Sequence, residues 1–183
     1  MKPLLLIAIA LGLSLPSATV TQEAPPPGTP SADSSVYREP FTLRLRVDKD
    51  HYYEEHYDKR IPYVLDGDVY IFSGEDFGLQ VTAKGAGGVD VTYQPDSKKA
   101  DVWLSFAQPK DLGAGMLLTI RNNLKQRLQV DALMTVPGKK GIYKTSIVPI
   151  EAGLSDFESW PHSIVQLVLR NFRLSESQLK PKH

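Results

Sequence analysis

Apolar and polar residues alternate along several stretches of this chain, and that period of two restricts its fold more than any other feature. Every second residue from Phe41 to Val47 is apolar, and Val102 to Phe106 repeats the pattern. Successive side chains of a β-strand point to opposite faces, so each stretch predicts a strand with one buried face. Residues 164–169 are apolar on both faces, which predicts a central strand.

Turn-forming residues separate these stretches. Asp66-Gly67 lies between the apolar runs 61–65 and 69–72, and this pair favours a two-residue hairpin in which both turn residues have positive φ. Nine or ten strands at this spacing predict an all-β, immunoglobulin-like antiparallel β-sandwich, with a closed β-barrel as the alternative. One stretch, Asn122–Met134, also fits a short helix, because apolar residues recur there at intervals of four.

The first 18 residues have the pattern of a cleaved signal peptide. Lys2 precedes an apolar run from Leu4 to Leu15, and the small residues of Pro16-Ser17-Ala18 follow it. The run is twelve residues long, whereas a membrane-spanning helix needs about 20. The sequence therefore predicts a periplasmic or extracellular protein of bacterial type, with no transmembrane segment.

Composition divides the rest of the chain. Residues 19–40 contain five prolines with several serines and threonines, which predicts a flexible leader whose deletion leaves the melting temperature unchanged. Residues 41–174 are long enough for a single β-sandwich domain with its own core. Residues 175–183 form a polar tail that we expect to be frayed.

The totals of charge and cysteine exclude some function classes. The chain has no cysteine, which rules out thiolate chemistry, disulfides and a lipid anchor on cysteine. It has 21 basic and 21 acidic residues, so no excess of positive charge points to nucleic acid.

The charge is nevertheless unevenly distributed along the chain. Residues 48–76 hold nine acids against three bases, and residues 121–183 hold ten bases against five acids. Such segregation can steer a charged partner.

The most unusual stretch is His51–Asp58, which combines tyrosines, histidines and carboxylates. Tyrosine offers a large contact area and a hydrogen-bonding hydroxyl, so this stretch is expected either to be an irregular binding loop or to place one or two of its rings as caps on the core. Trp160 either stacks on a partner or closes the end of the sandwich, and the second role is favoured. The candidate binding surface consists of Tyr52, Tyr53, Glu54, Glu55, His56, Tyr57, Asp58 and Trp160.

Closely spaced acids suggest calcium as the only candidate cofactor. Hard cations take several oxygen ligands, and the short-spaced acids that could supply them are Asp48, Asp50, Asp66 and Asp68. Turn chemistry alone also accounts for the last two. His51 and His56 are five residues apart, which in a strand places them on opposite faces and argues against a zinc pair.

No motif of nucleophilic, phosphate-binding or dinucleotide-binding sites occurs in the chain. The sequence therefore predicts no catalytic residues. It favours a secreted or periplasmic non-enzymatic protein that binds another protein or a component of the cell envelope. A calcium- or carbohydrate-binding module is the first alternative. A hydrolase that uses carboxylates with His51, His56 or His162 is the second.

Overall fold

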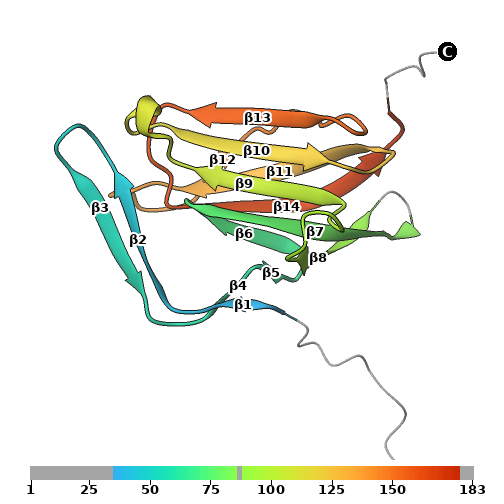
Figure 1. Cartoon of the computed structure of the whole chain (residues 1–183), viewed down its shortest axis with the longest axis horizontal. Coiled ribbons are helices and arrows are strands. Elements are labelled where there is room, and N and C mark those ends of the chain that lie inside the picture. Colours follow the sequence, from blue (N-terminus) through green and yellow to red (C-terminus); the bar gives the residue numbers. More distant parts are fainter. Residues whose placement is uncertain (1–34, 86–87, 178–183) are drawn as a thin grey trace, which may run out of the picture. The chain divides into compact units, whose positions relative to one another are not determined.

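Strands make up the fold, and the computed structural model describes them over residues 35–85 and 88–177 (Figure 1). All described residues belong to one unit, residues 32–183. One antiparallel sheet contains, in spatial order, β13 (Ser155–Trp160), β10 (Met116–Asn122), β9 (Val102–Ala107), β7 (Glu75–Ala83) and β8 (Val89–Gln94). The other contains β12 (Tyr143–Thr145), β11 (Arg127–Thr135), β14 (Gln166–Ser175), β6 (Asp68–Phe72) and β5 (Val64–Leu65).

Two strand pairs stand beside these sheets. The first joins β1 (Tyr37–Arg38) to β4 (Ile61–Pro62), and the second is a hairpin of β2 (Phe41–Arg46) and β3 (Tyr52–Tyr57). Figure 1 shows the β2–β3 hairpin, in blue and cyan, as an arm next to the two five-stranded sheets.

A single apolar core joins the two five-stranded sheets, as in a β-sandwich. Along β9, Val102, Leu104 and Phe106 are fully buried, and they share this core with Leu167 and Leu169 of β14. The all-β prediction is confirmed, and the described strands form two open sheets, not a closed barrel. β14 lies between β11 and β6, so it is a central strand of its sheet, as predicted. Leu167 and Leu169 enter the main core, whereas Val165, just before the strand, packs against Leu43 and Leu45 of the hairpin.

The helical alternative for residues 122–134 is wrong, because Arg127–Thr135 form β11. The buried side chain of Asn122 organises the preceding turn. Its amide donates to the carbonyl oxygens of Gln126 at 2.8 Å and of Ile150 at 3.0 Å, and its own oxygen accepts from the backbone N–H of Leu124. These bonds hold the segment between β10 and β11 in a turn.

The turn between β5 and β6 has the predicted conformation. Asp66 has φ of 53° and Gly67 has φ of 81°, and the flanking residues Leu65 and Asp68 pair across the hairpin. Two consecutive positive φ values are those of a type I′ turn, whose twist matches that of the strands.

Replacing Gly67 tests this turn. We expect Gly67→Val to lower the free energy of unfolding by about 1–3 kcal/mol, because a β-branched residue resists positive φ. No heavy atom lies within 4 Å of the position a Cβ would take, so the cost is conformational and not steric. Gly67→Asn is the matched control, since asparagine tolerates this region and should cost much less. Equal losses for the two variants in urea unfolding would contradict the assignment.

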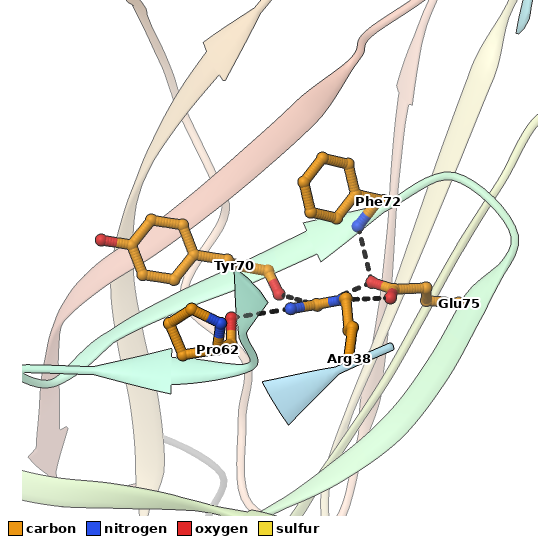
Figure 2. Close-up of polar contacts among 5 residues, drawn as sticks. All are labelled: Arg38, Pro62, Tyr70, Phe72 and Glu75. Atoms are coloured by element: carbon orange, nitrogen blue, oxygen red, sulfur yellow. Dashed lines mark hydrogen bonds and ion pairs between the residues drawn. The ribbon is translucent and has the colours of Figure 1, made fainter. Parts of the chain in front are cut away.

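The fold begins before residue 41, and a buried arginine is the reason. Arg38 of β1 is only 4% exposed, and its guanidinium forms a two-pronged ion pair with Glu75 of β7 (Figure 2). It also donates to the carbonyl oxygens of Pro62, at 2.7 Å, and of Tyr70. The ring of Tyr63 lies 3.9 Å beneath it. One side chain therefore ties β1 to β4, β6 and β7.

This finding changes the expectation for the predicted leader. A deletion of residues 19–40 removes Arg38 and leaves Glu75 without its ionic partner, so an unchanged melting temperature is no longer expected. The predicted signal peptide, residues 1–18, and the leader up to residue 34 lie outside the described residues, as does the tail beyond residue 177.

Candidate functional site

The tyrosine-rich segment is a regular strand, and the predicted irregular loop is wrong. Residues 52–57 form β3 and pair with β2 in continuous antiparallel register, with Leu45 opposite Tyr53 and Leu43 opposite Glu55. Opposite residues of an antiparallel pair share one face of the sheet. Tyr53, Glu55 and Tyr57 therefore lie on the same face as the apolar residues of β2.

That face of the hairpin packs on the sandwich through a small core of its own. Leu43 and Leu45 are buried together with Phe72 of β6 and Val165. The ring of Tyr57 is stacked on Phe41, with 4.9 Å between ring centroids. It also meets the ring of Phe72 edge-on at 5.1 Å.

Polar contacts fix the other end of the hairpin. The side-chain amide of Gln108 accepts a hydrogen bond from the backbone N–H of Arg46 at 2.7 Å and donates to its carbonyl oxygen at 2.8 Å. The hydroxyl of the buried Ser163 donates to the same carbonyl oxygen. Because the hairpin is held by an apolar patch and by these bonds, its inner face is a fixed surface.

A groove remains between this inner face and the connection from β11 to β12. Its volume is about 570 Å³. Tyr53, Glu55 and Tyr57 line it on the hairpin side, and Phe72 and Val165 line its apolar part. The remaining lining residues are Ile61, Thr135, Val136, Gly138, Lys139, Gly141, Ile142 and Gln166. We call this space the hairpin groove.

Two tyrosine hydroxyls in the hairpin groove share one carboxylate. Tyr57 donates to Oε2 of Glu55 at 3.0 Å, and Tyr53 donates to the same oxygen. Oε1 of Glu55 accepts no hydrogen bond from the described residues. Burial and the neighbouring carboxylate raise the pKa of Tyr53 to about 12 and raise the pKa of Tyr57 as well. Both phenols are therefore neutral donors at physiological pH, which suits recognition better than proton transfer.

These raised pKa values predict a specific loss of stability in alkali. The unfolded chain releases its tyrosine protons near pH 10, whereas folded Tyr53 holds its proton until about pH 12. The contribution of this group is thus complete below pH 10 and is lost as the pH rises toward 12. In urea unfolding between these two pH values, we expect the free energy of unfolding of Tyr53→Phe to fall less steeply with pH than that of the wild type. Tyr52→Phe, on the exposed face, is the control. An identical alkaline slope in Tyr53→Phe and the wild type would contradict the prediction.

The other half of the predicted binding stretch faces away from the groove. Tyr52, Glu54 and His56 lie on the outer face of β3, opposite Arg46, Arg44 and Thr42 respectively. The guanidinium of Arg44 lies 4.4 Å from the ring centroid of Tyr52 and 3.9 Å from a carboxylate oxygen of Glu54. The alternation of β3 thus separates the predicted surface into two faces.

The last two predicted surface residues lie elsewhere. Asp58 follows β3 and is exposed. Trp160 belongs to β13, where its indole N–H donates to Thr145 Oγ1 at 2.9 Å and its ring meets Phe106 edge-on. It packs against the main core.

The four aspartates suggested for calcium divide between two turns. In the β2–β3 turn, Asp48 accepts hydrogen bonds from the backbone N–H groups of Asp50 and His51, and these bonds lower its pKa. In the β5–β6 turn, Asp66 is a turn residue and Asp68 lies 3.6 Å from Arg170. The described part of the chain brings no three His, Asp or Glu side chains into a metal-binding group.

The acidic stretch 48–76 does not fold into one surface either. Glu75 forms the ion pair with Arg38, Glu55 lies in the hairpin groove, and Asp66 is a turn residue. The opposite wall of the groove could not be predicted from the sequence, because its residues are far from β3 along the chain. Lys139 and Ile142 follow the Pro137-Gly138 turn signal, and nothing in their own sequence relates them to β3.

Comparison of the chain with models of protein families, with curated proteins and with solved structures gives no match. Among residues 35–85 and 88–177, no helix has the length and apolar character needed to cross a membrane.

Proposed function

We propose that this chain is a secreted or periplasmic, non-enzymatic protein that binds another protein of the cell envelope through the hairpin groove. The observation that carries the proposal is the groove itself. It is a hollow of about 570 Å³ whose lining is shared about equally by apolar side chains and by polar ones, among them Glu55, Lys139 and Gln166. Such a combination is typical of recognition sites.

The rim of the groove supports a partner that buries apolar surface. Ile142 is 65% exposed there, beside Lys139. An exposed aliphatic side chain at the edge of an apolar hollow gains stability when a partner covers it. Because both tyrosine hydroxyls donate their single proton to Glu55, the hydroxyl oxygens and Oε1 of Glu55 can orient a partner by accepting its hydrogen bonds.

The packing of the aromatic rings favours a protein over a carbohydrate. Sugar recognition by tyrosine needs an open ring face. The ring of Tyr57 is stacked on Phe41 and meets Phe72, so these rings cover part of it. A calcium- or carbohydrate-binding module is therefore the weaker proposal, and a hydrolase has no specific observation in its favour.

The remaining parts of the proposal depend on the sequence. The signal-peptide pattern of residues 1–18 supports export, and the absence of cysteine fits a bacterial envelope. The two-layered arrangement of antiparallel sheets supports the immunoglobulin-like form of the sandwich.

Affinity capture from an envelope extract tests the function. The bait is the mature chain, compared with Ile142→Asp in the groove and Val148→Asp outside it. Val148 is 59% exposed, so both substitutions place a charge at a similarly exposed aliphatic position. We expect a protein that the wild type and Val148→Asp retain and that Ile142→Asp loses. Retention of the same proteins by all three baits, or of none, would overturn the proposal.

A further inference from the structure

We propose that the free edge of β3 binds an extended peptide segment of alternating apolar and basic residues, which adds a third strand to the hairpin. The inference rests on the proposed function and names the partner and the manner of binding. In this arrangement the apolar side chains of the segment enter the hairpin groove, and its basic side chains lie on the outer face beside Glu54.

The backbone of β3 has unpaired groups on the side away from β2. Val47 N–H donates to His51 C=O, which makes this pair a hydrogen-bonded one. In an antiparallel ladder such pairs alternate, so Tyr53, Glu55 and Tyr57 direct their backbone groups to β2. Tyr52, Glu54 and His56 direct theirs outward, and the described residues supply no strand on that side. An unpaired edge of this kind is a template for strand addition.

The hairpin groove lies where the side chains of an added strand would go. Its lining includes the three inner residues of β3, which are Tyr53, Glu55 and Tyr57, and the β11–β12 connection opposite them. A strand along the free edge of β3 continues the inner face of the hairpin. Every second side chain of that strand would therefore enter the groove, where Ile142 is exposed on the opposite wall.

The charges on the outer face of the hairpin favour basic residues in the added strand, at the positions between its apolar residues. On the outer face Arg44 of β2 stands opposite Glu54 of β3, and a base on the next strand continues this alternation of sign. Opposite charges on neighbouring strands are stabilising, and like charges are destabilising.

The same charges oppose a second copy of this chain as the occupant. Two copies of β3 paired about a two-fold axis in a central register would place Glu54 opposite Glu54, or Glu55 opposite Glu55. Either arrangement sets two carboxylates directly across from each other. These carboxylates therefore work against self-association in a central register, while Glu54 can still pair with a basic side chain of an added segment.

A peptide titration followed by NMR tests the inference. The probe is the capped peptide Lys-Val-Lys-Val-Lys-Val, and the ¹⁵N-labelled full chain reports binding residue by residue. We expect saturable shifts at the amides of Tyr52, Glu54 and His56, and slower hydrogen exchange there. The capped peptide Glu-Val-Glu-Val-Glu-Val and a copy of the probe N-methylated at alternate residues should bind at least about tenfold more weakly.

Two variants separate edge pairing from other modes of binding. Glu54→Pro removes an outward N–H and leaves the bonds to β2 intact, and edge strands tolerate proline at such a position. Glu54→Lys keeps the N–H and reverses the charge. Both should weaken binding of the probe by about tenfold while the melting temperature stays near that of the wild type. If Glu54→Pro unfolds, the N-methylated probe reports on the same hydrogen bonds.

Several outcomes would overturn the inference. They are shifts outside β3 and the groove, equal binding of the acidic and basic probes, no saturable shift, or a dimer in sedimentation that Glu54→Lys abolishes. The envelope capture separates this failure from that of the proposed function. A captured protein that depends on Ile142 but does not compete with the probe would preserve the binding function and reject strand addition.

Discussion

Replacement of Arg38 by alanine is expected to lower the free energy of unfolding by about 3–5 kcal/mol. The guanidinium is almost completely buried, and Glu75, 20% exposed, is its ionic partner. Without Arg38 the carboxylate remains in a poorly solvated position, and the carbonyl oxygens of Pro62 and Tyr70 lose a donor. Urea unfolding of the variant and the wild type at pH 7 measures the difference.

Two controls test the cause. Arg44→Ala removes an arginine whose ion pair with Glu54 is more than 60% exposed on both sides, and it should change stability by less than about 1 kcal/mol. The double variant Arg38→Met, Glu75→Leu removes both charges together and should be more stable than Arg38→Ala alone. A loss for Arg38→Ala no larger than that for Arg44→Ala would contradict a stabilising role for the buried ion pair with Glu75.

Truncation of Leu104 or Leu167 should be similarly damaging, by about 2–5 kcal/mol for each alanine variant. Both side chains are fully buried in the core that joins the two sheets, one from β9 and the other from β14. Each truncation removes apolar contacts and leaves a cavity that the rigid surroundings fill only in part.

The matched control for these truncations is Leu154→Ala, because that leucine is 48% exposed. This variant should lower the free energy of unfolding by well under about 2 kcal/mol, since the truncation removes little buried apolar surface. Thermal unfolding of the three variants ranks them directly. If all three melt together, the two sheets do not share the core described here.

Local patterns predicted the parts of the fold that depend on neighbouring residues. The alternation at residues 102–106 was sufficient because one face of β9 is wholly apolar and buried. Asp66-Gly67 predicted its hairpin because the turn needs positive φ at both positions, which few residue pairs supply. In both cases the physical cause lies within a few residues of the signal.

The errors have a common physical origin in distant partners. Residues 52–57 are polar or aromatic on both faces, so no alternation of hydropathy indicated β3, and its pairing with β2 determines its conformation. Arg38 follows a proline-rich stretch, and its partner Glu75 is 37 positions away. The groove wall at Lys139 and Ile142 meets β3 only in the folded chain.

Site-specific photo-cross-linking tests the central claim, that the hairpin groove is the binding surface, most directly. A photo-reactive benzophenone amino acid is placed at position 142 on the rim of the groove, or at position 148 outside it, where the native side chains are similarly exposed. Each chain is irradiated in the presence of envelope extract. We expect a discrete protein adduct at position 142 that is absent at position 148. An adduct at position 148 alone would contradict it.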